Sequence, residues 1–294
     1  MKEMKKGKVG VITGGGSGHE PAFVGYLGDG MLDSVAIGEV FASPPALAFY
    51  DAIVDADQGE GVAVLFGNYA GDNMNVKMAV QMAEDDDIEV KYVVANDDVA
   101  SAPKAVKEQR HGIAGGFFMW KVGGARAAKG GSLDDVIASA QNVVNRTKSI
   151  CVGLEPCVIP ALGHSNFKIE DGTMEFGVGH HGEAGTKVEK LKSASEMAQE
   201  MAETILNDFD FEEGKEVAVM LSGLGATPVM ELYVLYDEVE KVLAKAGHKV
   251  WKTYIGNYVT SLDMNGASLT IVDLDDEIKE LLSEPAVPIG MKNY

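Results

Sequence analysis

Three side chains capable of acid–base chemistry stand in or beside glycine-rich stretches of the chain: His19, Asp72 and His181. A neutral imidazole can act as a nucleophile or a base near neutral pH. A carboxylate can take the proton of a hydroxyl group as that oxygen attacks. Adjacent side chains on an extended segment point to opposite sides, so only one of His180 and His181 can face a given site. These residue types could carry out nucleophilic or acid–base chemistry on a small molecule with a hydroxyl group.

Other interpretations of the same residues stay open at this point. His19 could belong to a plain glycine turn, and Asp72 could cap the helix that follows it. A metal site formed by His164, His180, His181 and Glu183 is a competing interpretation. Zinc sites usually take histidines spaced along one helix face or carried on converging strands, and adjacent histidines in a loop match this poorly. We therefore predict no metal site.

The surrounding sequence predicts how each residue is positioned. An apolar run over residues 9–13 predicts a strand, and Gly14 to Pro21 predicts a tight loop containing His19. This loop has no third glycine at the spacing of a dinucleotide fingerprint, and it is not a P-loop. Asp72 follows a strand expected over 61–67 and precedes a helix whose Met74, Met78 and Met82 we expect to face the core. His181 lies in a loop expected over 174–185.

Strands and helices alternate along the chain, and the strands end in polar, glycine-containing loops. This pattern is typical of α/β proteins in which strand ends carry the ligand site. The sequence predicts two α/β layered domains with mixed sheets and a substrate site on glycine-rich loops, divided into residues 1–147 and 148–294. Further strands are expected over 34–37, 88–94, 150–154, 216–221, 251–255 and 268–272, and helices over 46–56, 117–129, 133–146, 194–206 and 228–246.

Composition excludes several classes of partner. The 294 residues include 25 Lys and Arg against 45 Asp and Glu, giving a net charge of −20. Nucleic acids and anionic membranes both require a basic face, so neither is an expected partner. We find no transmembrane apolar run and no signal peptide, and we expect a cytoplasmic protein. Cys151 and Cys157 are too few for a disulfide framework and are expected to be buried free thiols.

Several blocks of sequence resemble the dihydroxyacetone kinase family. They occur in the family's order from about Gly7 to about Val272, so that the resemblance covers nearly the whole chain. The blocks are residues 14–21 (GGGSGHEP), 38–44 (GEVFASP), 68–72 (NYAGD), 177–185 (GVGHHGEAG), 224–228 (LGATP) and 260–264 (TSLDM).

The resemblance implies roles for individual residues. The family's histidine before the G-E-P-G motif, here His181, binds the carbonyl carbon of a short ketose as a hemiaminal. The glycine loop that wraps the sugar corresponds to Gly16, Ser17, Gly18 and His19. Asp72, together with His19, is implied to activate the terminal hydroxyl for attack on a phosphoryl donor. The family's substrate subunit has two α/β domains and forms homodimers.

The resemblance also implies a second protein. The sequence has no motif for the phosphate and metal that phosphoryl transfer requires. Because the chain ends at Tyr294, we expect a stand-alone substrate-binding subunit with no nucleotide or metal of its own. Mg-ADP or Mg-ATP is expected on a nucleotide-binding L-type subunit, which a phosphotransferase-system phosphoprotein recharges in the bacterial version.

Three departures from the family pattern define the alternatives. Only about six residues precede the first strand, Gly67 replaces a lysine common before N-Y, and the last motif reads His180-His181-Gly182-Glu183-Ala184 instead of I-H-G-E-P. Loss of the lysine removes a hydrogen-bond donor or makes room for a larger sugar. The alternatives are a kinase subunit for another short ketose such as erythrulose, and a dihydroxyacetone-binding co-regulator without kinase activity.

Overall fold

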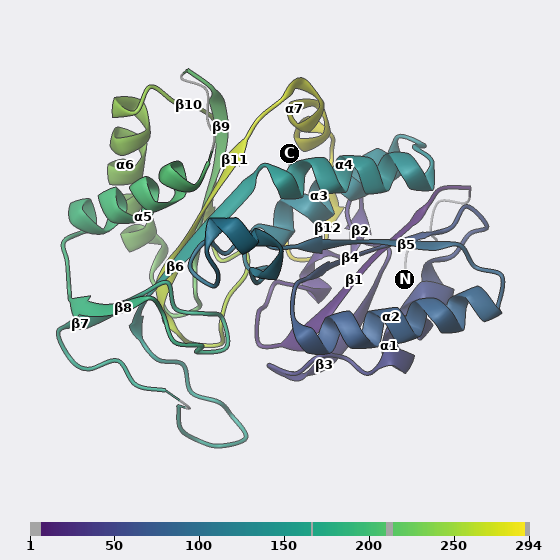
Figure 1. The fold of residues 1–294 in the computed structure, drawn as a ribbon, viewed down its shortest axis with the longest axis horizontal. Helices are drawn as coiled ribbons and strands as arrows, with labels where there is room; N and C mark the ends of the chain where they lie inside the picture. The colour runs from purple at the N-terminus through teal and green to yellow at the C-terminus, as the bar shows by residue number, and fades with distance from the viewer. Residues whose placement is uncertain (1–6, 166, 210–213, 292–294) are drawn as a thin grey trace. The chain divides into compact units, whose positions relative to one another are not determined.

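The structure, a computed structural model, describes residues 7–165, 167–209 and 214–291. The chain divides into two compact units. Unit 1 consists of Met1–Ala95, Gly116–Asn145 and Asp275–Tyr294, and unit 2 consists of Asn96–Gly115 and Arg146–Leu274. Each unit is an α/β fold, as predicted, and Figure 1 shows the course of the chain through both.

Unit 1 has a parallel sheet of order β3-β1-β4-β5 with helices on both faces. Helices α1 and α2 lie along one face, and α3 and α4 lie along the other (Figure 1). A small second sheet pairs β12 with β2. The elements are β1 Gly10–Ser17, η1 Val24–Tyr26, β2 Gly28–Asp29, β3 Ser34–Val40, α1 Ala46–Ala56, β4 Val62–Gly67, α2 Ala70–Asp85, β5 Val90–Ala95, α3 Gly116–Ala128, α4 Leu133–Asn145, α7 Asp276–Ser283 and β12 Val287–Pro288.

Unit 2 has a sheet of order β10-β9-β11-β6-β7-β8, in which only β10 and β9 run parallel. The predicted mixed sheet is therefore found in unit 2, whereas the main sheet of unit 1 is parallel throughout. Helices α5 and α6 pack together against the sheet. The elements are η2 Lys104–Gln109, β6 Thr147–Glu155, β7 Thr173–Phe176, β8 Lys187–Lys190, α5 Ala194–Asp208, β9 Glu216–Gly223, α6 Val229–Lys245, β10 Lys249–Gly256 and β11 Asn265–Asp273.

The predicted boundary at residue 147 differs from the observed division in two segments. Residues 96–115 leave unit 1 after β5 and join unit 2. Val99 N–H donates to Ser149 O at 3.0 Å, and Ser149 N–H donates to Asp97 O at 2.8 Å, so this segment is hydrogen-bonded to β6. Local sequence patterns do not encode such pairing between distant segments, which explains why the prediction kept these residues in the first domain.

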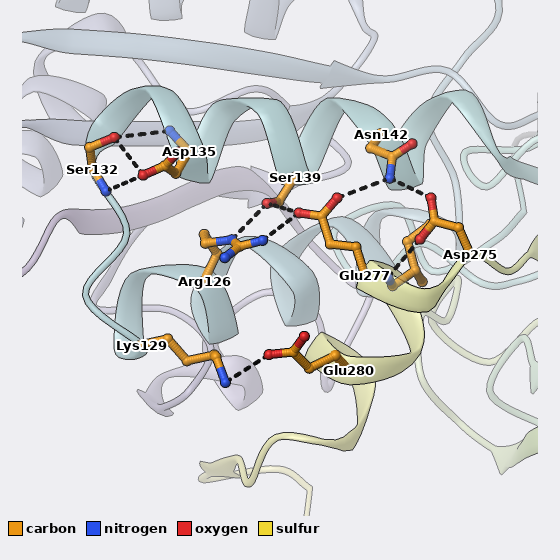
Figure 2. Close-up of polar contacts among 10 residues, drawn as sticks. Arg126, Lys129, Ser132, Asp135, Ser139, Asn142, Asp275, Glu277 and Glu280 are labelled. Atoms are coloured by element: carbon orange, nitrogen blue, oxygen red, sulfur yellow. Dashed lines mark hydrogen bonds and ion pairs between the residues drawn. The ribbon is translucent and has the colours of Figure 1, made fainter.

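The second segment is the C-terminal helix α7, which returns to unit 1 (Figure 2). Glu277 accepts hydrogen bonds from Arg126 of α3 and Ser139 of α4 at 2.5 and 2.6 Å. Asn142 of α4 donates to Asp275 at 2.8 Å. Within the described part of the chain, residues 275–291 therefore belong to the first unit, whereas the sequence had suggested the second.

The glycines after the first predicted strand do not form a loop. Strand β1 continues to Ser17 and contains Gly14, Gly15 and Gly16. A Cβ atom at Gly14 would lie 2.3 Å from the Phe49 ring, and one at Gly15 would lie 2.2 Å from the Phe23 ring. The prediction of a loop from residue 14 is therefore wrong, because these glycines make room for packing rather than for a turn.

The predicted core face of helix α2 is also wrong. Met74 and Met78 are 61% and 51% exposed, whereas Val76 and Ala79 are fully buried. The methionines share a face by their spacing, but spacing cannot say which of two apolar faces meets the sheet. Cys151 and Cys157 are buried free thiols, as predicted. Among the described residues, no helix is long and apolar enough to span a membrane.

Candidate functional site

In unit 1, His19 follows the carboxyl end of strand β1. Gly18, with φ of +106°, turns the chain out of the strand. The His19 side chain is buried against aromatic rings, because it stacks on Phe41 at 5.2 Å between ring centroids and meets Phe23 edge-on at 6.1 Å. Ser17 donates its hydroxyl to Gly38 O at 2.8 Å and accepts the Phe41 N–H at 3.0 Å through its carbonyl. The end of β1 is thus attached to the segment of residues 38–44.

Asp72 lies in the first turn of α2, and it does not cap that helix. The N-cap residue is Tyr69, which makes no side-chain capping bond. Asp72 is only 8% exposed, and its carboxylate accepts a hydrogen bond from the Ser43 hydroxyl at 2.9 Å. Asn75 in turn donates to Ser43 Oγ at 3.3 Å and to Pro44 O at 2.7 Å. A buried carboxylate oriented in this way can accept a proton from a ligand hydroxyl.

Residues 38–44 therefore connect the two predicted residues of unit 1. His19 stacks on Phe41, and Asp72 is bound by Ser43 two residues later. Gly16 is required here, because a Cβ atom would lie 2.7 Å from the backbone nitrogen of Ala42. The structure thus brings Gly16, Ser17, Gly18, His19 and Asp72 to one edge of the unit 1 sheet. His181 belongs to unit 2.

In unit 2, the two histidines lie in a tight turn between β7 and β8. Gly179 N–H donates to Glu183 O at 2.9 Å, and Gly182 N–H donates to Gly179 O at 3.1 Å. Gly182 has φ of +81°, a conformation that costs glycine little. Glu175 accepts the Gly185 N–H at 2.7 Å and holds the far end of the turn. The turn is therefore closed by its own backbone and anchored to strand β7.

The two histidines differ in exposure, in agreement with the prediction that only one of them can face a given site. His180 is 3% exposed, and its carbonyl accepts a hydrogen bond from the Ser261 hydroxyl. The His181 side chain is 24% exposed. Its Nδ1 lies 2.9 Å from Glu183 Oε1, and its backbone N–H donates to Glu183 Oε2 at 2.8 Å. His181 is thus the histidine that a ligand can reach, and Glu183 contacts it twice.

Carboxylates surround the turn and differ in protonation. Burial alone raises the pKa of Glu183, but the hydrogen bond and charge of His181 and the backbone donors outweigh it, so that the pKa falls to about 2. Burial raises the pKa of Asp98 to about 7, and the nearby charges of Asp97 and Glu183 add to that increase. Glu183 is therefore ionised at neutral pH, whereas Asp98 is partly protonated.

Some residues of the site were missing from the sequence prediction. Ser43, Phe41 and Glu183 contact the predicted residues directly. Ser43 and Phe41 had no assigned role, and Glu183 had been considered only as part of the metal alternative. Their blocks, 38–44 and 177–185, had been singled out, but nothing in a linear motif says which member contacts a catalytic group. The metal alternative gains no support, since the described residues contain no group of three His, Cys, Asp or Glu side chains arranged to hold an ion.

Comparison with known protein families gives one match across the chain. The Dak1 domain model matches residues 1–289. The chain belongs to the Dak1 family. The resemblance to dihydroxyacetone kinases predicted from the motifs is thereby confirmed, and this Dak1 chain is DhaK-like.

This Dak1 chain is similar to proteins of three kinds: a kinase subunit, an erythrulose kinase and an operon co-activator. It is 42% identical over 275 residues to the dihydroxyacetone-binding subunit DhaK of PTS-dependent dihydroxyacetone kinase 1 from Listeria innocua, covering 94% of the chain and 84% of the relative. It is 38% identical over 282 residues to D-erythrulose kinase from Mycolicibacterium smegmatis, covering 96% of the chain and 49% of the relative. The solved structure of the dihydroxyacetone kinase operon co-activator DhaQ superposes with a TM-score of 0.92 at 31% identity, covering 97% of the chain and 89% of that structure.

Proposed function

We propose that this chain is the substrate-binding subunit of a dihydroxyacetone kinase. His181 holds dihydroxyacetone as a hemiaminal, and Asp72 with His19 takes the proton from the terminal hydroxyl as it attacks the phosphoryl donor. Gly16, Ser17 and Gly18 bind the sugar. The product is dihydroxyacetone phosphate. The observation that carries the proposal is the reachable His181 imidazole, held by Glu183 in a glycine turn, in a chain 42% identical to a DhaK subunit.

The phosphoryl group comes from a partner in this proposal. The chain's own residues bind and orient the ketose, and Mg-ADP or Mg-ATP lies on a separate nucleotide-binding L-type subunit. The chain acts as a homodimer in the cytoplasm. The similarity to the dihydroxyacetone-binding subunit of a PTS-dependent kinase in Listeria innocua supports a partner as the source of the phosphoryl group.

Native mass spectrometry with dihydroxyacetone tests the covalent step. We expect a mass gain equal to one ketose molecule, no gain with glycerol, which has no electrophilic carbon, and no gain with His181→Ala. His164→Ala is the matched control, because His164 is exposed and lies outside the turn. A wild-type chain that never gains this mass would contradict the proposal. Mixing the chain with a cognate L-type subunit and a phosphoryl donor then shows whether the sugar phosphate forms.

A co-regulator is the second candidate. The similarity to the DhaQ co-activator, with a TM-score of 0.92, favours it. Such a protein would bind the ketone through His181 and yield no sugar phosphate with any L-type subunit. The third candidate is a kinase subunit for erythrulose. The similarity to D-erythrulose kinase favours it, as does Gly67, which replaces a lysine common in the family and makes room for a larger sugar. Competition between the two ketoses for adduct formation separates this candidate from the first.

A further inference from the structure

Glu183 makes two contacts with a single residue. One carboxylate oxygen, Oε2, accepts the backbone N–H of His181 at 2.8 Å, and the other, Oε1, lies 2.9 Å from the ring nitrogen Nδ1. Both oxygens of the carboxylate therefore face a nitrogen of His181. An ionised carboxylate can only accept hydrogen bonds, so the Nδ1 atom that faces it must carry a proton.

The turn is shaped to keep this carboxylate in place. A Cβ atom at Gly179 would lie 2.2 Å from Glu183 Oε2, so a side chain at that position would displace the carboxylate. Burial would raise the pKa of Glu183, but the hydrogen bond and charge of His181 and the backbone donors lower it to about 2, so the carboxylate stays ionised across the physiological range. The contact is therefore built into the turn and does not depend on a mobile surface side chain.

We propose that Glu183 is a positioning residue that holds the His181 ring in the tautomer protonated at Nδ1, so that Nε2 presents its lone pair to the ketone. The hydrogen bond at one ring nitrogen decides which tautomer a histidine adopts, and here that bond is to Glu183. This inference rests on the proposed function, because it assigns the reacting atom of His181. It also assigns a role to the acid of the H-G-E motif.

The covalent step balances with these groups. Nε2 donates its lone pair to the carbonyl carbon, the new N–C bond forms, and the π electrons of the C=O bond move to oxygen. The oxygen takes a proton from water, and the ring, now positively charged, faces the Glu183 carboxylate. The Nδ1 proton stays on the ring, so the hemiaminal is an imidazolium paired with the ionised Glu183 carboxylate, and the hydroxide left by the water is neutralised by the solvent. The carboxylate thus stabilises the charge that develops as the bond forms.

Glu183→Gln provides a discriminating test because an amide has one oxygen and one NH2 group. Its oxygen must remain on the His181 backbone N–H, since NH2 facing that donor would leave both unsatisfied. The NH2 group then faces Nδ1, which can accept only by losing its proton to Nε2. The near-isosteric substitution should therefore reverse the tautomer and block Nε2. In the serine protease triad, a substitution that reverses the histidine tautomer lowers kcat about 10⁴-fold. For Glu183→Gln we expect the rate of adduct formation to fall at least about a hundredfold.

The experiment measures the tautomer and the reaction separately. Nitrogen NMR of the 15N-histidine-labelled chain without ligand identifies the protonated ring nitrogen, and loss of a signal in His181→Ala assigns it. We expect protonated Nδ1 in the wild type and protonated Nε2 in Glu183→Gln. Time-resolved native mass spectrometry with dihydroxyacetone then gives the rate of adduct formation. Glu175→Gln is the matched control, because Glu175 holds the same turn through Gly185 N–H and should keep the wild-type tautomer and rate.

Glu183→Ala completes the series. If Glu183 only supports the turn, truncation to alanine must slow the reaction more than the isosteric glutamine does. If it sets the tautomer, glutamine is at least as harmful as alanine, because the ring in Glu183→Ala can adopt either form. A Glu183→Gln chain with protonated Nδ1 and the wild-type rate overturns the inference. A wild type that forms no adduct overturns the proposed function, while the NMR result alone still decides the role of Glu183.

Discussion

In unit 1, Gly14, Gly15 and Gly16 lie inside strand β1, whereas in unit 2 Gly179 and Gly182 bracket a tight turn. At the strand positions a side chain would collide with aromatic rings or with the backbone of Ala42, and glycine avoids these collisions. The turn glycines provide a positive φ and the space for the Glu183 carboxylate. Two stretches of similar composition therefore use glycine for different physical purposes, one for packing and one for chain reversal.

The surroundings of the two stretches differ as well. Phe23, Phe41 and Phe49 surround the strand and His19, whereas carboxylates surround the turn and His181. Phenylalanine rings do not titrate, whereas Asp98 titrates near neutral pH. We therefore expect the unit 2 turn to respond to pH and the unit 1 strand to respond to added volume.

The largest expected effect is on the pH dependence of stability, through Asp98. Its pKa is about 7 in the folded chain against 3.8 for the unperturbed group, so the folded state binds the proton more tightly. Stability is lost as pH rises through 7, and the change between pH 5 and pH 8 should be about 2–3 kcal/mol. Asp98→Asn removes this contribution. Urea unfolding of both chains at the two pH values measures it, and parallel pH profiles for the two chains would contradict the prediction.

The next effect is on stability through Gly16→Ala. The added methyl group meets the backbone of Ala42, which cannot move aside as a flexible side chain could. We expect the free energy of unfolding to fall by about 1–3 kcal/mol. In Gly179→Ala the obstructing atoms belong to the Glu183 side chain, from Oε2 at 2.2 Å to Cβ at 2.9 Å, and not to the backbone. Displacing that side chain should cost less stability than displacing the Ala42 backbone, but it takes the carboxylate away from His181 and should slow adduct formation. Thermal unfolding of both variants checks this, and equal losses of stability would break the contrast between strand and turn.

The smallest expected effect is on the rate of phosphorylation in Ser43→Ala, and it separates that step from adduct formation at His181. Ser43→Ala removes the hydroxyl that orients the Asp72 carboxylate. Under the proposed function, the rate of phosphorylation with a cognate L-type subunit should fall roughly tenfold. This factor corresponds to the free energy of about 1.5 kcal/mol that a hydrogen bond to a charged group contributes. Adduct formation at His181 should be unchanged. Steady-state kinetics and native mass spectrometry measure the two steps, and a Ser43→Ala chain that also loses the adduct would show that the steps are not separable.

Much of this protein could be predicted from its sequence because the signals are local. Helix α1 has the expected bounds, and strand β9 and helix α5 begin at the expected residues, since apolar periodicity and capping residues such as Ser193 act over short distances. The ordered motifs identified the family, which the Dak1 match confirms. The site roles of His19, Asp72 and His181 remain predictions, although the structure places each at the end of a strand or in a turn.

The tertiary structure alone decided what those motifs contact. Whether Gly14 to Gly16 continue a strand depends on Phe23 and Phe49, and which face of α2 is buried depends on the sheet beneath it. The return of α7 to unit 1 depends on Arg126 and Ser139, more than a hundred positions away in the chain. The sequence singled out His181 over His180, but only the fold showed that His180 is buried and that Glu183 holds His181. Local propensity acts within a few residues, whereas packing and hydrogen bonding join segments that the linear sequence keeps apart.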